Sequence, residues 1–248
     1  MRYLIILFLL IPSLCFAGVD FDGTDDYIDL PDAIHDFSGE FSITAWINQD
    51  SDGSLQTIVA KDQDGNNFAF VFFVSSIKEL GFGCKDLGSQ TFATPHPTTI
   101  NAGTWYHVAV VVDGAGDATL YVNGDTPTTS ALGDRNDKGS LRIGETPDAF
   151  WGSIDGSITE VTIWKTALTD EQVELQADSN RKRLSLEINS SNLAGMWALD
   201  DGADGTANCF NGSAGFLDIS GNGNHGTGND GANNTGLICE AETLLSYP

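Results

Sequence analysis

The stretch FSITAWI at positions 41–47 alternates its side chains as a half-buried β-strand requires. Its Phe, Ile, Ala and Ile side chains fall on one face and its Ser, Thr and Trp side chains on the other, because successive strand residues point to opposite faces. The runs at 68–74 and 108–112 are apolar, which is typical of strands that are covered on both faces. These segments predict a β-sheet protein with a buried core.

Turn residues and one helix signal organise the surrounding chain. Asn123-Gly124 supplies the pair of residues with positive φ that a type I′ hairpin turn requires. The sequence TDEQ at 169–172 forms a capping box, and Leu168 and Val173 are placed to form the hydrophobic staple beside it. The sequence therefore predicts many short strands, as in a sandwich or barrel, and one short helix at 170–177.

Several segments follow one another in a recognisable order. They are VDFDGTDDYI at 19–28, FSITAWI at 41–47, WYHVA at 105–109, LYVNG at 120–124, GSITEVTIW at 156–164 and ALT at 167–169. In this order they resemble the concanavalin A-like lectin/glucanase superfamily and, within it, the laminin G-like (LamG) jelly roll. The resemblance implies an all-β fold, a two-sheet antiparallel jelly-roll sandwich, over residues 18–180.

The first residues predict export from the cytoplasm. Arg2 precedes an apolar run at 3–14 and a small-x-small ending at Ala17, which is typical of a signal peptide covering residues 1–17. The run is too short to span a bilayer, which needs about 20 apolar residues. We therefore expect a secreted, extracellular or cell-surface protein that is cleaved after Ala17 and has no membrane span.

The charge balance narrows the possible partners. The chain has 11 basic and 35 acidic residues, a formal net charge of −24. Nucleic acid and anionic membranes are poor partners for such a surface. The acidity indicates solubility or a saline habitat, or an acidic functional site, and it favours bound Ca²⁺, which would relieve part of the self-repulsion.

Three cysteines remain after the predicted cleavage, at positions 84, 209 and 239. Cys209 and Cys239 share the glycine-rich tail, so we expect them to form the disulfide in an oxidising compartment, with Cys84 left over. The spacing of the cysteines does not match a zinc site.

Calcium is the favoured metal. Asp22, Asp25 and Asp26 cluster in a glycine-containing turn, and carboxylate oxygens from such turns suit Ca²⁺. The family resemblance implies a metal near this turn, bridged to the loop before the last strand, where Asp155 lies. The family carries an Asp where this chain has Thr159, which removes one expected ligand. The alternative is that these residues only form the turn.

A second calcium candidate is the segment DQDGN at 62–66, with Asp62, Asp64 and Asn66 as its oxygen donors. It resembles the first half of an EF-hand loop but lacks the closing Glu. A plain hairpin turn is the alternative interpretation.

Carbohydrate recognition requires aromatic platforms with polar neighbours. Trp151, in a loop-like segment, is the leading candidate for ligand contact, followed by Trp46 and Trp164, for which burial in the core is the alternative. The expected ligand is a glycan or an extracellular protein.

Catalysis is not expected. A retaining glycosidase needs two carboxylates about 5 Å apart on one face. The nearest match, Asp155 and Glu160, is five residues apart and would point to opposite faces of a regular strand. We therefore predict a non-catalytic binding or adhesion module, with a glycoside hydrolase of the same superfamily as an alternative.

Residues 181–248 form a tail rich in Gly and Asn. It contains LAGMWALDDG at 193–202 and DISGNGNHG at 218–226, pieces that usually open a jelly-roll module in similar proteins. Here they follow the module. The tail could complete its own sandwich, donate a strand to a neighbouring molecule and so build filaments, or be a disordered remnant of a lost repeat.

Overall fold

The computed structural model describes most of the chain after the predicted signal peptide. The described residues are 18–63, 68–86, 89–125, 127–132, 135–148, 150–178, 184–186, 188, 190–199, 206–207, 215–230 and 238–239. Among these residues, none forms a helix that is long and apolar enough to cross a membrane.

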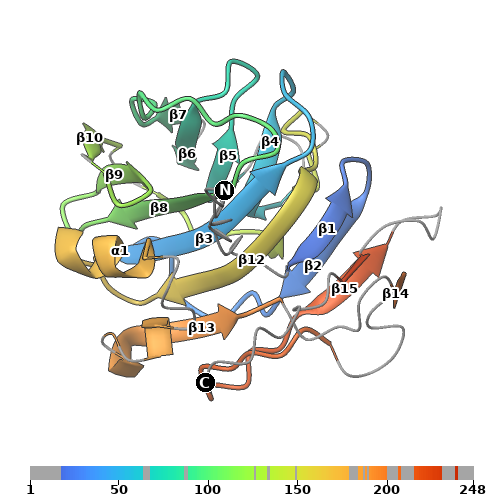
Figure 1. Ribbon diagram of the computed structural model, residues 1–248. Helices are drawn as coiled ribbons and strands as arrows, with labels where there is room; N and C mark the ends of the chain where they lie inside the picture. Colours follow the sequence, from blue (N-terminus) through green and yellow to red (C-terminus); the bar gives the residue numbers. More distant parts are fainter. Residues whose placement is uncertain are drawn as a thin grey trace, which may run out of the picture.

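Two antiparallel sheets face each other across one core (Figure 1). Sheet A has the order β10 (Thr128–Ala131), β9 (Asp117–Val122), β8 (Tyr106–Val112), β3 (Phe41–Gln49), β12 (Asp155–Trp164), β1 (Val19–Asp22), β16 (Ile238–Cys239) and β14 (Thr206–Ala207), with β13 (Leu193–Trp197) also paired to β12. Sheet B has the order β15 (Thr227–Asp230), β2 (Asp26–Leu30), β11 (Ser140–Ile143), β4 (Gln56–Asp62), β5 (Phe70–Val74), β6 (Leu80–Asp86) and β7 (Ser89–Phe92).

The core explains why these strands form a sandwich. Alternate residues of both sheets point inward, and the rings of Phe41, Phe70 and Phe82 meet there with centroids 5.5–6.2 Å apart. Such interdigitation of two inner faces is how aligned sandwiches bury their apolar surface. The predicted all-β sandwich with a single short helix is confirmed.

The helix begins as its capping box predicts. In α1 (Asp170–Gln176) the Thr169 side chain accepts a hydrogen bond from the Gln172 N–H, and the Gln172 side chain accepts one from the Thr169 N–H. Ala177 is the C-cap. Val173 and Leu168 pack with Trp164 on the outer face of sheet A, so α1 covers one half of that face.

The tail contributes strands to both sheets within its own chain. On the edge of β12 opposite β3, β1 pairs with residues 155–158, and β13 pairs with residues 161–164. β15 pairs with β2, so strands from the two ends of the chain lie side by side (Figure 1). Two short 3₁₀ turns, η1 (Leu184–Leu186) and η2 (Ser190–Asn192), precede β13. The division into 18–180 and 181–248 stays a prediction.

A loop of the tail holds β13 in place. The Asp218 carboxylate accepts hydrogen bonds from the N–H groups of Met196, Ser220 and Asn224. The Asn222 amide donates to the carbonyls of Leu193 and Ala194. These bonds give the DISGNGNHG segment a structural role.

Candidate functional site

The acidic turn between β1 and β2 brings three carboxylates together. Oxygen atoms of Asp22, Asp25 and Asp26 lie within 4.8 Å of one another. Gly23, at φ 74°, allows the tight turn, and Asp26 anchors it by accepting a hydrogen bond from the Asp22 N–H at 2.9 Å. Asp26 is buried, whereas Asp22 is exposed. The three side chains therefore bring together carboxylate oxygens, the type of ligand atom that Ca²⁺ prefers.

Asp155 borders this turn from β12. It is the cross-strand partner of Asp22, and a Cβ added to Gly23 would lie 2.8 Å from the Asp155 Cβ. The Ser51 hydroxyl donates to the Asp155 Oδ2. Asp155 thus adjoins the turn, while the converging oxygens come from the three residues of the turn itself. Its role as a metal ligand stays a prediction.

Glu145 is a further acidic residue near the turn, and no sequence motif predicts it as part of this site. Burial raises its pKa to about 7; Arg142 acts in the opposite direction, and the charges of Asp25, Asp29 and Asp26 raise it further. Glu145 follows β11, far from the turn in sequence. Only the pairing of β11 with β2 brings it close.

The other half of the outer face of sheet A carries polar side chains around Trp46. Asp20 and Asp22 alternate with core residues of β1, and the Ser157 hydroxyl donates to the Asp20 carboxylate at 3.4 Å. On the neighbouring strands the rings of Trp46 and His107 meet edge to face at 5.5 Å. We call this surface the Trp46 face; it consists of Asp20, Asp22, Trp46, Asn48, His107, Asp155 and Ser157.

Among the residues that the structure describes, two buried polar atoms of the Trp46 face have no hydrogen-bond partner, Asn48 Oδ1 and His107 Nδ1. Burial lowers the pKa of His107 to about 3, so the ring is neutral at ordinary pH. Trp46 is 7% exposed and His107 1%. Trp105 lies at the same edge, because a Cβ added to Gly18 would be 3.4 Å from its Cη2. Sequence reasoning missed Asn48, His107 and Trp105 as site residues. Alternation along β3 puts Asn48 on the same face as Trp46, whereas His107 and Trp105 join that face only through the pairing of β8 with β3.

The three predicted tryptophans occupy different places. Trp46 shares its face with Asp22 and Asp155. Trp164 is fully buried under α1, where its Nε1 donates to the Thr162 hydroxyl at 2.9 Å. Trp151 packs on the outer face of sheet B with 2% of its surface exposed.

The second calcium candidate and the disulfide are only partly described. Asp62 ends β4 as a buried residue, whereas Asp64 and Asn66 lie outside the described residues. Cys209 lies outside them too, and only the backbone of Cys239 is described, in β16. Cys84 is buried in β6.

Comparison with known proteins agrees with this architecture. The family model Laminin_G_3, described as the concanavalin A-like lectin/glucanases superfamily, matches residues 22–174. The chain belongs to this superfamily. Among curated proteins, the sequence has no match.

Solved structures share the fold at low sequence identity. A Limulus polyphemus SAP-like heptameric pentraxin has a TM-score of 0.53 and 22% identity, over 69% of this chain and 86% of that one. A Bacteroides ovatus protein, provisionally described as carbohydrate binding, has a TM-score of 0.65 and 20% identity. That match covers 93% of this chain, which spans only 61% of the Bacteroides protein. The Ruminococcus gnavus IT-sialidase CBM40, bound to α2,3 sialyllactose, has a TM-score of 0.51 and 12% identity, over 64% and 95% of the two chains.

Proposed function

We propose that the protein is a secreted, non-catalytic binding module that recognises carbohydrate on the Trp46 face. Ca²⁺ bound by Asp22, Asp25 and Asp26 would support this face from its β1 end. Cleavage after Ala17 would make Gly18, which borders Trp105, the first residue of the mature chain.

One observation carries the proposal: the pairing of an indole ring with polar atoms that lack partners. Buried polar atoms are nearly always hydrogen-bonded, so Asn48 Oδ1 and His107 Nδ1 call for a partner from outside the described residues. A pyranose offers hydroxyls to both atoms and an apolar ring face to Trp46. Aromatic platforms with a few placed polar groups are typical of such sites.

Calcium would act on this face through charge. Asp22 and Asp155 are cross-strand partners, and like charges directly opposite each other destabilise a sheet. A divalent cation in the adjacent turn offsets this repulsion and orders the chain that enters β1 and β2. Asp155 stays a proposed contributor, either to the ion or to the ligand.

The relatives support a binding function in general terms. The Bacteroides protein carries a carbohydrate-binding description, and the CBM40 module was solved with a sialylated trisaccharide. The superfamily also includes glucanases. On β12 of this chain Glu160 lies at an irregularity, with φ 50° and its N–H donating to the Ala198 carbonyl. This irregularity interrupts the regular alternation, so strand periodicity alone no longer places Asp155 and Glu160 on opposite faces; the absence of catalysis stays part of the proposal.

The test compares two asparagine variants of the secreted protein. Its binding is first measured on a glycan array and then by calorimetry with the best glycan, in Ca²⁺ and in EDTA. Asn48→Ala should weaken binding about fivefold, the value of one hydrogen bond, and should not lower the melting temperature, because it also removes a buried acceptor that has no partner among the described residues. Asn222→Ala is the matched control, because its amide bonds the backbone of β13; it should lower the melting temperature and leave affinity unchanged. Unchanged affinity of Asn48→Ala would contradict the proposal.

A further inference from the structure

The outer face of sheet B, on the far side of the sandwich from the Trp46 face, carries an aromatic cluster. Trp151 comes from the loop between β11 and β12. Its ring lies 5.1–5.8 Å from the ring centroids of Phe68, Phe73, Phe92 and Phe150. Beneath it lie the smaller side chains of Ala60 and Val71. Four phenyl rings, from β5 and the residues before it, from β7 and from the loop of Trp151 itself, therefore pack around one indole.

Glycines let this cluster lie close to the sheet. A Cβ on Gly81 would lie 2.5 Å from the Phe73 ring, and a Cβ on Gly83 would lie 2.5 Å from the Phe92 ring. Real Cβ atoms do not approach this closely, so the two rings lie against bare backbone of β6. The sheet surface is shaped to hold the rings of Phe73 and Phe92 in fixed positions.

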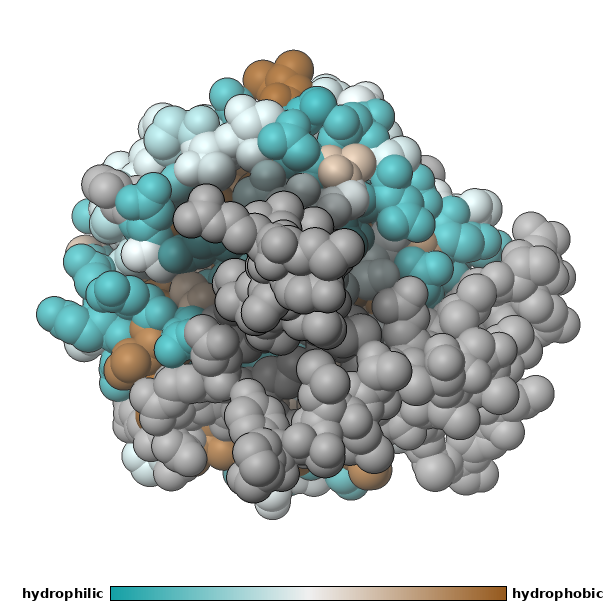
Figure 2. All heavy atoms as spheres, in the orientation of Figure 1, coloured by the Kyte–Doolittle hydropathy of each residue, from teal (hydrophilic) through white to brown (hydrophobic). Residues whose placement is uncertain are grey.

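The outer rings of the cluster are open to solvent. Trp151 is 2% exposed, whereas Phe92 is 46% exposed and Phe150 71%. We call Phe92, Phe150 and the underlying Trp151 the aromatic ledge. Burial of Trp151 accounts for the contacts among the inner rings. It does not account for the solvent exposure of Phe92 and Phe150. Among the residues drawn in colour in Figure 2, which views the opposite face, hydrophobic residues occur as separate spots. Adjacent exposed rings on a strongly acidic protein indicate a binding surface.

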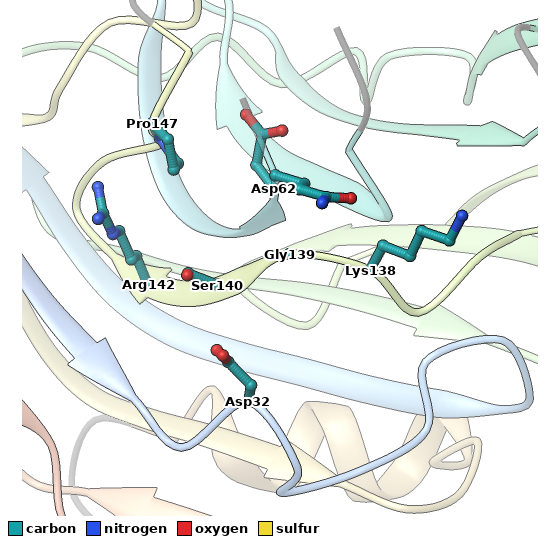
Figure 3. Close-up of a pocket in the computed structure, with 8 residues that line it drawn as sticks. Asp32, Asp62, Lys138, Gly139, Ser140, Arg142 and Pro147 are labelled. Carbon is teal, nitrogen blue, oxygen red and sulfur yellow. The ribbon is translucent and has the colours of Figure 1, made fainter. Parts of the chain in front are cut away.

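A polar hollow adjoins the ledge. Ala60, which packs with Trp151, is the cross-strand partner of Arg142, and Arg142 lines a hollow of about 680 Å³. Arg142 and Lys138 lie at its two ends with the Asp62 side chain between them (Figure 3). The lining residues are Asp32, Asp62, Gln63, Lys138, Gly139, Ser140, Arg142 and Pro147. A volume of several hundred cubic ångströms is typical of small-ligand sites.

The chemistry of the hollow favours neutral hydroxyl groups. Lys138 and Gln63 are exposed donors, while Asp32 and the Gln63 carbonyl are acceptors. The positive charge of Arg142 is balanced by Asp29, 3.0 Å away, and its guanidinium lies 3.9 Å from the Tyr27 ring centroid. The remaining cation of the lining, Lys138, is accompanied by the acidic residues Asp32 and Asp62, so the hollow has no excess of positive charge to hold an anionic sugar, and the chain as a whole carries −24.

We propose that the aromatic ledge and the polar hollow form a second binding surface, for a neutral oligosaccharide. One sugar ring stacks on Phe150 and Phe92, and a neighbouring unit reaches the hollow past Pro147. The acidic turn that would hold Ca²⁺ supplies none of these residues, so binding here is independent of calcium. The site does not depend on the function proposed for the Trp46 face.

The test uses the secreted protein in EDTA, with calorimetric titration of neutral and sialylated oligosaccharides. Phe150→Ala and Phe92→Ala should each weaken binding of the neutral oligosaccharide about fivefold, because stacking contributes on this scale. Ile77→Ala is the matched control. Ile77 is 70% exposed, almost the same fraction as Phe150, and it lies in a separate turn. It should bind as the unmodified protein does.

Three results would overturn the proposal: no neutral oligosaccharide binds in EDTA, the two Phe variants bind as tightly as Ile77→Ala, or the sialylated probe binds more tightly than the neutral one. Asn48→Ala separates this site from the Trp46 face. Loss through Asn48→Ala alone would support only the Trp46 face, and loss through Phe150→Ala alone would support only the ledge.

Discussion

The two halves of the outer face of sheet A are built from the same strands, β3, β8 and β12, yet they treat polar atoms differently. Under α1 the polar groups satisfy one another. The hydroxyls of Thr44 and Thr162 lie 2.6 Å apart, and Thr44 also donates to the Gln176 side chain at 3.0 Å. On the Trp46 face, Asn48 Oδ1 and His107 Nδ1 are buried, and no described residue gives either of them a hydrogen bond.

This difference separates a structural surface from a candidate binding surface. A satisfied network stabilises the fold and has nothing left to offer a ligand. A buried donor or acceptor without a partner destabilises the fold by about 1–3 kcal/mol, so a hydroxyl of a ligand or of water that reached these atoms would be stabilising. We therefore expect similar substitutions in the two halves to differ in their effects on stability and on ligand binding.

The largest expected difference is between the two tryptophans. Trp164→Ala should lower the free energy of unfolding by about 4 kcal/mol, because it leaves a cavity under α1 and removes one of the hydrogen bonds that Thr162 makes. Trp46→Ala should lower it by less, because Trp46 keeps 7% of its surface exposed and lies outside the cluster that α1 covers, and should abolish glycan binding. Urea unfolding followed by circular dichroism measures both. Equal losses of stability would erase the distinction between the halves.

Calcium should act only on the Trp46 half. If the acidic turn binds Ca²⁺, saturation at about 100 times the dissociation constant adds about 2.7 kcal/mol to stability, which EDTA removes. Asp25→Asn should abolish this response, because it removes one of the three converging carboxylates.

Asp170→Asn, at the start of α1, is the control and should keep the full calcium response. Melting curves with Ca²⁺ and with EDTA are the measurement. Identical curves for the unmodified protein would rule out a stabilising calcium site.

A smaller effect on stability is expected at the edge of the half of sheet A that α1 covers, where Asp218 bonds the backbone of β13. Burial acts to raise the pKa of Asp218, but its hydrogen bonds from Ser220, Met196 and Asn224 prevail and lower it. Asp218→Asn should lower the free energy of unfolding by about 2 kcal/mol at neutral pH.

The pH dependence of this loss follows from the sign of the pKa shift. The stabilisation is fully present above the unfolded pKa of about 3.9, and it is lost as pH falls through the lower pKa of the folded state. The unmodified protein and Asp218→Asn should therefore converge in acid. Urea unfolding over a pH series checks this, and a gap that persisted in strong acid would assign the effect to something other than the charge.

Local features could be predicted from the sequence because neighbouring residues create them. The capping box of α1 formed as expected, and Asn123 and Gly124 adopt the positive φ values, 55° and 68°, of the predicted hairpin turn. The Asp22, Asp25 and Asp26 cluster could be found for the same reason, since one short turn carries all three carboxylates.

The tryptophan sites could not be ranked in this way. Trp46 and Trp164 lie in strand-like segments and Trp151 in a loop-like one. The neighbouring residues in the sequence do not predict which distant side chains will cover each ring. The packing of α1 buries Trp164, and the phenyl rings on sheet B bury Trp151. Asn48 and His107 became candidates only when register placed them beside Trp46.

The sequence by itself determined the strands, the turn types, the helix start and the acidic turn, because periodicity and capping depend on residues a few positions apart. Only the tertiary structure decided the place of the tail. β1 covers one half of the free edge of β12, and β13 pairs with the other half, where unpaired backbone groups would otherwise be left. That choice depends on contacts between residues far apart in the chain, which no local pattern records.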